Sequence, residues 1–395
     1  MKHTAKQDQV VQFSRGVPPA EAIPTSGLVS SVRAILEEHA DRLFQYAPLG
    51  GYLGDAQLRA QIGEFFGFDP DGIFVSNGSL QVLDILSAYL LAKAESKTVL
   101  VETPTYDRAI HMFERHGGRV IGVPLEHDGL DLQALEDHLR KVSPAFLYLI
   151  PDFQNPSGVT LCAEKRRLLA ALVSRHDLTV IEDIPYRELR LRGEAPALLS
   201  QSSDGGQVIT VGSLTKLLSP GLRIGFAITD QATAINLARL AENTYLSPSP
   251  LCQAVAAHCM SSGLMRANIS HILNILLPRH DHAVQAVKDT FGSGLIAVPN
   301  GGYYLGVKLE AGCEERWFIR AAQQQGVILT RGSAFYPQSA PLKQGSIFLR
   351  LPFHAIEPDD FAAGINRLER VMNGSDEAES SGSRTVTGEQ PAAIA

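Results

Sequence analysis

The sequence contains few cysteines, and those it has are widely spaced. The four are Cys162, Cys252, Cys259 and Cys313, and none belongs to a CxxC pair. Paired spacings of that kind are typical of zinc sites and redox motifs, so we expect no metal site. The cysteines are predicted to be thiols of a protein in a reducing compartment.

The sequence also lacks long apolar runs and dense basic segments. Its most apolar helix candidate, Leu80–Ala92, is too short to cross a bilayer, and its polar start, MKHTAKQDQV, does not have the pattern of a signal peptide. Charged residues make up 19% of the chain, and the formal net charge is -7. No basic block favours nucleic acid. We therefore expect a cytoplasmic protein whose partners are neither membranes nor nucleic acids.

The hydrophobic content is 45% over 395 residues, enough for more than one typical domain. Short apolar segments alternate with helical stretches such as Leu132–Val142 and Ala163–His176. This alternation predicts an α/β protein with a mainly parallel, seven-stranded sheet between helices, and ligands of such sheets bind beyond the carboxyl ends of the strands. The expected strands are Ile73–Ser76, Thr98–Glu102, Val120–Pro124, Phe146–Ile150, Thr179–Asp183, Val208–Gly212 and Ile224–Ile228.

The pattern predicts a large domain at residues 46–274 and a smaller α+β domain at residues 275–372. Residues 1–45, which include an expected helix at Ser30–Phe44, should pack with the smaller domain. Residues 373–395 are rich in Gly, Ser, Thr and Glu and contain no aromatic residue. A disordered tail is predicted there, because such a composition cannot build a core.

The segment GSLTKLLSPGLRIGF, residues 212–226, follows a predicted strand and should lie at the ligand edge of the sheet. It carries Ser213, Lys216 and Arg223. A lysine whose pKa is lowered by nearby positive charge forms an imine with an aldehyde, while a hydroxyl and a guanidinium suit a phosphate. A lysine in a loop is most often a solvated surface charge, but these three groups in one segment favour the chemical interpretation.

A second segment, VSNGSLQVLDIL, places Gly78, Ser79 and Leu80 at a tight turn where a helix begins. Free N–H groups at a helix N-terminus bind anions, so this turn is a candidate phosphate cradle. The alternative is an ordinary helix cap.

Two further strand ends carry polar side chains. Asp183 closes the strand of TVIEDIPYREL, and Tyr186 follows it. A carboxylate in this place pairs with a protonated pyridine nitrogen, or else it only caps the next turn. Asn155 lies in the Pro-bounded turn of LIPDFQNPSGVTL, where its amide either donates to a phenolate oxygen or serves the turn alone.

Together these segments resemble the fold-type I pyridoxal 5′-phosphate (PLP) enzymes, and among them the class I/II aminotransferases of the aminoadipate/multi-substrate subgroup. The resemblance runs from Phe13 to Met372. It implies that Lys216 carries PLP as a Schiff base and shuttles protons, and that Asp183 pairs with the pyridine nitrogen. It also implies phosphate contacts from Ser213, Arg223 and the turn at Gly78, Ser79 and Leu80, contacts to the ring O3′ from Asn155 and Tyr186, and stacking of Tyr106 on the ring.

The same resemblance implies contacts to the substrate and to a neighbouring subunit. Arg350, in FLRLPF, matches the arginine that grips the substrate α-carboxylate, with Asn155 beside it, and Gly16, in FSRGVPP, matches a backbone contact to that carboxylate. Tyr46 matches a tyrosine that reaches the phosphate of the other subunit. A homodimer with shared active sites is therefore expected.

Three residues depart from the pattern of the subgroup. Asp152 stands where the turn before Asn155 usually has Asn, Arg15 stands where a small residue is usual, and Arg331 stands where an uncharged residue is common. Because arginine is hard to bury without an anionic partner, Arg15 and Arg331 are candidate contacts for a polar or anionic group of the substrate. The alternative is that both point to solvent or pair with acidic side chains.

The resemblance implies a ping-pong aminotransferase that moves an amino group from an amino acid to a 2-oxo acid, with 2-oxoglutarate as the expected acceptor. Two alternatives stay open. One is a PLP enzyme of another outcome, such as β- or γ-replacement, cyclisation or oxidation of an amino acid. The other is a ligand-sensing regulatory domain, which would need a DNA-binding module ahead of Phe13, where we expect no room for one.

Overall fold

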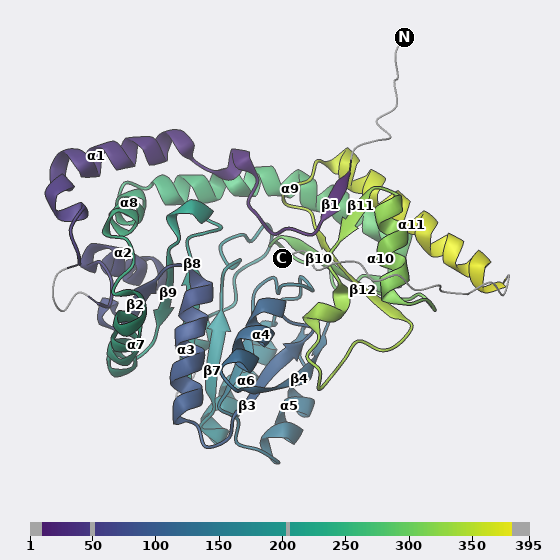
Figure 1. Cartoon of the computed structure of the whole chain (residues 1–395), viewed down its shortest axis with the longest axis horizontal. Helices are drawn as coiled ribbons and strands as arrows, with labels where there is room; N and C mark the ends of the chain where they lie inside the picture. Colours follow the sequence, from purple (N-terminus) through teal and green to yellow (C-terminus); the bar gives the residue numbers. More distant parts are fainter. Residues whose placement is uncertain (1–9, 48–51, 203–205, 381–395) are drawn as a thin grey trace, which may run out of the picture.

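The computed structural model describes residues 10–47, 52–202 and 206–380. A larger part, built around one sheet, lies beside a smaller part that contains the paired strands β10 and β12, and helix α9 (Leu264–Phe291) runs from one to the other (Figure 1). The boundary proposed between residues 274 and 275 falls inside α9, so one continuous helix joins the two parts. Among the described helices, none has the length and apolar content needed to span a membrane.

The main sheet has the strand order β2-β9-β8-β7-β6-β3-β4-β5. All seven predicted strands are present, and the eighth, β5, is a two-residue antiparallel addition to β4 that is too short to leave a sequence pattern. Strand β9 runs antiparallel to both of its neighbours, and the other strands of the seven are parallel. The strands are β2 (Ile73–Ser76), β3 (Thr98–Thr103), β4 (Arg119–Glu126), β5 (Gly129–Leu130), β6 (Phe146–Leu149), β7 (Thr179–Asp183), β8 (Gln207–Ser213) and β9 (Gly225–Ile228).

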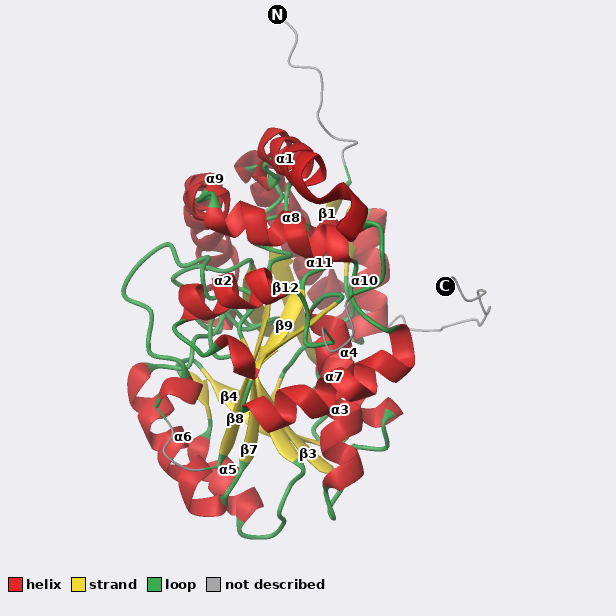
Figure 2. Cartoon of the chain, turned by 90° about the vertical axis from the view of Figure 1, so that its left-hand side faces the viewer, coloured by secondary structure: helices red, strands yellow, loops and turns green. Residues whose placement is uncertain are grey.

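The central strands are apolar throughout because helices cover both faces of the sheet. In β3 the side chains of Val99 and Val101 enter one core and that of Leu100 enters the other. Figure 2 shows the sheet between the two helix layers. Helices α5 (Leu132–Leu139) and α6 (Ala163–His176) cover one face. The helices that build the other side are α2 (Ala56–Phe66), α3 (Ser79–Lys93), α4 (Asp107–Arg115), α7 (Gln231–Tyr245) and α8 (Pro250–Ser261).

The smaller part is built on two short sheets. Strands β10 (Tyr304–Glu310) and β12 (Ser346–Pro352) pair antiparallel, and β1 (Val11–Phe13) pairs parallel with β11 (Val327–Leu329). Helices α10 (Glu315–Gln324) and α11 (Pro358–Ser380) complete it.

The two ends of the chain differ in part from expectation. Strand β1 joins the smaller part, as expected for the N-terminal segment, but helix α1 (Thr25–Leu43) packs along α8 of the larger part and begins earlier than the expected Ser30. Helix α11 continues to Ser380, past the expected end at Met372. The rest of the predicted tail, residues 381–395, lies outside the described residues.

A buried ionic cluster fixes the turn that follows β6. Asp152 has no exposed surface and pairs with Arg166 at 2.9 Å, Arg187 at 3.1 Å and Arg190 at 3.0 Å. Arg166 belongs to α6, and the other two arginines follow β7, so one carboxylate ties three segments together. This contact explains the departure at position 152, because a neutral Asn there would leave three guanidinium groups without their anion.

We expect Asp152→Asn to lower the free energy of unfolding by about 3 kcal/mol, because the variant leaves buried positive charge uncompensated. The measurement is a urea unfolding curve followed by circular dichroism. Asp71→Asn is the matched control, since Asp71 pairs with Arg59 at 3.8 Å from an exposed position, where an ion pair contributes less than about 1 kcal/mol. Equal, small losses in both variants would contradict the structural role given to Asp152.

Candidate active site

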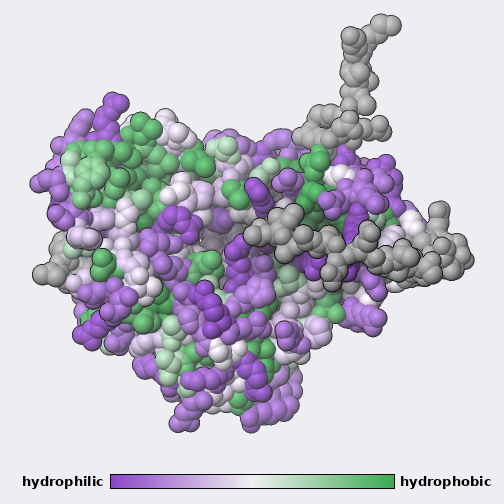
Figure 3. Space-filling view, in the orientation of Figure 1, coloured by the Kyte–Doolittle hydropathy of each residue, from purple (hydrophilic) through white to green (hydrophobic). Residues whose placement is uncertain are grey.

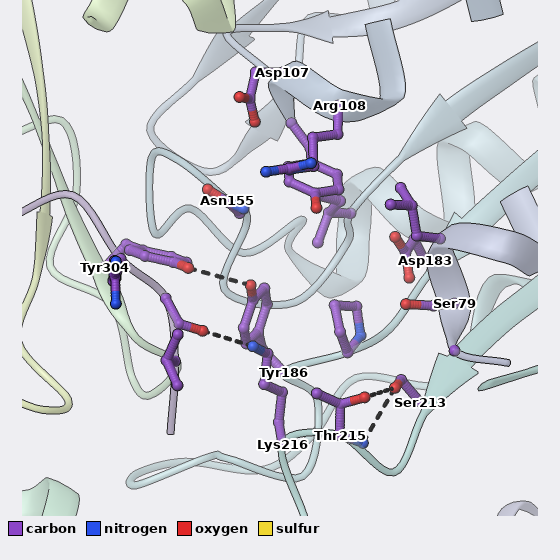
Figure 4. A pocket seen from close by; sticks show the side chains of 18 of the residues that line it. Ser79, Asp107, Arg108, Asn155, Asp183, Tyr186, Ser213, Thr215, Lys216 and Tyr304 are labelled. Atoms are coloured by element: carbon purple, nitrogen blue, oxygen red, sulfur yellow. Dashed lines mark hydrogen bonds between the residues drawn. The ribbon is translucent and has the colours of Figure 1, made fainter. Parts of the chain in front are cut away.

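A cavity of about 600 Å³ lies at the carboxyl edge of the main sheet, where β2, β3, β6, β7 and β8 end. It brings together most of the residues that the sequence pointed to, from segments far apart in the chain (Figure 4). The predicted residues that line it are Arg15, Gly16, Gly78, Ser79, Leu80, Tyr106, Asn155, Asp183, Tyr186, Ser213, Lys216, Arg223 and Arg350.

Two predicted residues do not line this cavity. Tyr46 follows α1 and is 77% exposed. Arg331 is exposed at the end of β11, and its neighbour Thr330 faces the cavity instead.

Lys216 lies between β8 and β9 with its amine in the cavity. Its Nζ donates a hydrogen bond of 2.6 Å to the carbonyl oxygen of Gly16 and lies 5.7 Å from the centre of the Tyr303 ring. Burial, and then the positive charges of Arg223 and Arg350, lower the pKa of Lys216 to about 8. A larger share of neutral amine is therefore present near neutral pH, and the neutral amine is the form that attacks an aldehyde.

Asp183 is the last residue of β7, and one of its two carboxylate oxygens accepts a hydrogen bond while the other does not. Its Oδ2 accepts a hydrogen bond of 2.9 Å from the Tyr148 hydroxyl, whereas Oδ1 is buried without a partner among the described residues. Burial raises the pKa of Asp183 to about 7, against the opposing effect of the Tyr148 hydrogen bond. A buried carboxylate without a cation is costly, so this position suits a protonated ring nitrogen.

An anion cradle forms where α3 begins. Gly78 has φ 89°, a conformation that favours glycine, and a Cβ at this position would displace the Arg223 guanidinium. Arg223 donates to the carbonyl oxygen of Asn77 at 3.2 Å. Ser213 lies in the same region, and its Oγ accepts the Thr215 N–H at 3.1 Å. The helix N-terminus, the guanidinium and the hydroxyls together suit a phosphate.

Arg350, on β12, forms the opposite side of the cavity. Its Nη1 donates to Oδ1 of Asn155 at 3.2 Å, and its Nη2 donates to the carbonyl oxygen of Ser14 at 2.9 Å. The guanidinium carbon lies 5.1 Å from the centre of the Tyr304 ring and 4.8 Å from that of Phe335. These contacts hold the planar group in one orientation, which is what bidentate binding of a carboxylate requires.

The N-terminal segment closes the cavity over Lys216 and Arg350. A Cβ on Gly16 would come within 1.8 Å of the Tyr304 hydroxyl, so only glycine allows this close approach. The Tyr186 hydroxyl donates to that of Tyr304 at 3.5 Å, and Figure 4 shows the two rings at the side of Lys216.

Sequence reasoning missed several residues of the site. Tyr148 could have been found from the sequence, because it is the one hydroxyl-bearing residue of the otherwise apolar strand FLYLI. Tyr303 and Tyr304 could not, because aromatic residues after a Gly-Gly turn usually belong to a core. Lining residues outside the prediction include Ser14, Asp107, Arg108, Thr215, Tyr304 and Thr330.

The residues of the cavity fit pyridoxal 5′-phosphate. A buried lysine of lowered pKa, a phosphate cradle and a buried carboxylate with a free oxygen are the three groups that this cofactor needs. Fold and cavity together therefore define a PLP enzyme with a mixed sheet flanked by helices.

Comparison with known proteins gives the family. The family "Aminotransferase class I and II" matches residues 10–360. A 2-aminoadipate transaminase from Thermus thermophilus is 31% identical, with 92% of this chain and 90% of that protein covered. The crystal structure of LysN, an α-aminoadipate aminotransferase from the same species complexed with N-(5′-phosphopyridoxyl)-L-leucine, superposes with a TM-score of 0.84 at 29% identity, covering 93% of each chain.

The domain also occurs in regulators. The "Probable rhizopine catabolism regulatory protein MocR" from Rhizobium meliloti is 30% identical, with 92% of this chain and 72% of that protein covered.

This chain belongs to the class I and II aminotransferase family. It is a PLP-dependent aminotransferase, and its substrates are amino acids and 2-oxo acids.

The raised pKa of Asp183 predicts a pH dependence of stability for the protein without PLP. A carboxyl whose pKa is raised from 3.8 to about 7 stabilises the fold below about pH 4, and this contribution is lost as pH rises through about 7. The loss should be on the order of 4 kcal/mol, since each pKa unit corresponds to about 1.4 kcal/mol. Asp183→Asn cannot ionise, so the difference between its unfolding free energy and that of the wild type isolates the effect. A difference that stays constant from pH 4 to 8 would show that Asp183 titrates normally.

Proposed function

We propose that this enzyme transfers the amino group of an amino acid to 2-oxoglutarate by a ping-pong mechanism, with Lys216 as the residue that binds the cofactor and moves the proton at the substrate Cα. The main support is the position of Lys216, buried in one cavity with the anion cradle at Gly78 and with Arg350. When bound, PLP supplies an electrophilic carbonyl for amines and an electron sink for the carbanion formed at Cα.

The other side chains have roles that follow from their contacts. Arg350 binds the α-carboxylate of the substrate, with Asn155 and the backbone of Gly16 beside it, and its fixed plane orients Cα relative to Lys216. The Nζ of Lys216 accepts the Cα proton as the neutral amine and returns it as the ammonium, which a pKa of about 8 permits near neutral pH.

The remaining residues hold the ring and its phosphate. With PLP bound, Asp183 would keep the ring nitrogen protonated. Tyr186 and Asn155 would contact the ring O3′. Tyr106 packs on the ring face, and Ser213, Arg223 and the Gly78–Leu80 turn bind the phosphate.

We expect the purified holoenzyme to be yellow and Lys216→Ala to lose the absorption band of the lysine-bound cofactor together with more than about 99% of the turnover, since the variant has neither the imine-forming amine nor the proton carrier. Borohydride reduction followed by peptide mapping should label Lys216. Lys165→Ala is the control, because Lys165, on α6, pairs with Glu126 and Asp128 and does not line the cavity. A label on any lysine other than Lys216 would overturn the assignment.

We further propose a cytoplasmic homodimer with shared active sites. Four large hydrophobic side chains are strongly exposed near α1 and after α7: Val29 at 56%, Phe44 at 73%, Tyr46 at 77% and Leu246 at 52%. In Figure 3, hydrophobic residues gather at the upper left, over helix α1. A second copy would cover this surface and would bring Tyr46 to the phosphate in its partner's cavity.

Mixing two inactive variants tests this arrangement. Tyr46→Phe and Lys216→Ala should each have little activity alone, and refolding them together should restore up to about a quarter of the wild-type activity, because half of the chains pair as hybrids and each hybrid has one intact site. Sedimentation velocity should give a dimer. Sedimentation as a monomer at concentrations where the enzyme is active would rule out shared sites.

A further inference from the structure

Arg108 lines the cavity and has no role in the proposed mechanism. It lies in the first turn of α4, after Tyr106, and lines the cavity with Asp107. In Figure 4 its guanidinium extends into the cavity in the direction of Asn155. Within residues 10–47, 52–202 and 206–374, Arg108 has no hydrogen-bond or ion-pair partner.

Five cations and two acids line the cavity. The cations are Arg15, Arg108, Lys216, Arg223 and Arg350, and the acids are Asp107 and Asp183. The cofactor engages Lys216, Arg223 and Asp183, and the substrate α-carboxylate engages Arg350. Two arginines and Asp107 are left over. Arg15 and Arg108 are thus the two cations of the cavity that remain available to a further anionic group of the substrate.

Of the two remaining arginines, Arg108 is the better placed. Arg15 also lines a neighbouring cavity of about 490 Å³ on the outer side of the N-terminal segment, so its side chain is shared between two spaces. Arg108 lies close enough to Tyr106 for its charge to lower the pKa of that tyrosine, although burial has the larger effect and raises it overall. The guanidinium thus lies near Tyr106, a residue of the proposed cofactor wall.

We propose that Arg108 is a specificity-determining residue that binds an anionic group at the far end of the substrate side chain, above all a second carboxylate, while Arg350 holds the α-carboxylate. The inference rests on the proposed function and names the class of substrate, dicarboxylic amino acids and 2-oxo acids. Arg108 is exposed, so the preference should be moderate, about tenfold in affinity for the second carboxylate.

Two five-carbon inhibitors measure this preference without turnover. Glutarate carries a carboxylate at each end and pentanoate carries one, so both can occupy Arg350 but only glutarate can also reach Arg108. We would titrate each into the holoenzyme and follow binding by calorimetry. Wild type should bind glutarate about tenfold more tightly than pentanoate, and the difference should shrink as salt is added. Arg108→Gln should weaken glutarate about tenfold and pentanoate by less than about twofold.

Three further variants make the result specific. Arg108→Lys keeps the charge and should retain part of the glutarate preference. Arg167→Gln removes an exposed arginine of α6 that does not line the cavity, and it should bind both inhibitors as wild type does. Arg15→Gln should keep the preference for glutarate.

Several outcomes would overturn the inference. Equal losses of both inhibitors in Arg108→Gln, no loss of either, or a selective loss of glutarate in Arg15→Gln but not in Arg108→Gln would each do so. A wild type that transfers amino groups but binds glutarate no better than pentanoate would also overturn it and leave the proposed function intact. A wild type that transfers no amino group would contradict the proposed function, and the glutarate preference would still decide the role of Arg108.

Discussion

The site depends on the concentration of positive charge around one buried lysine. Lys216 shares its cavity with Arg223 and Arg350, and their charges add to burial in lowering its pKa to about 8. Cations gathered in one cavity repel one another, so the fold must fix each one in place and leave it ready for an anionic ligand. Phosphate and carboxylate groups are the ligands that relieve this repulsion. The same interaction therefore prepares the lysine for chemistry and selects the molecules that bind near it.

The rest of the structure holds these cations in position. Arg223 is anchored by the carbonyl of Asn77 beside the N-terminus of α3, and Arg350 by Asn155 and the backbone of Ser14. Asn155 is itself fixed because the neighbouring Asp152 ties its turn to α6 and to the segment after β7. The larger part thus supplies the proposed cofactor cradle, and the N-terminal segment and β12 supply the proposed substrate end, so residues of both parts line the cavity.

The sequence predicted the sheet well because its strands are buried on both faces and therefore read as apolar runs, as in FLYLI. It also predicted the residues at strand ends, since parallel strands deliver these to one edge. The sequence did not predict very short strands or contacts between segments that lie far apart in the chain. Strand β5 has two residues, and the close approach of the Tyr304 hydroxyl to Gly16 joins segments from opposite ends of the chain. Nearness in sequence was also misleading, since Thr330 faces the cavity while Arg331 is exposed.

The central claim is that Lys216 and its surroundings transfer an amino group rather than direct the substrate to another fate. The most direct measurement mixes the holoenzyme with an amino-acid donor in the absence of any 2-oxo acid and quantifies the products per active site. Amino transfer predicts one equivalent of the 2-oxo acid derived from the donor, after which the reaction stops until 2-oxoglutarate is added and glutamate forms. Continuous product formation without an acceptor, or binding without any 2-oxo acid, would contradict the account.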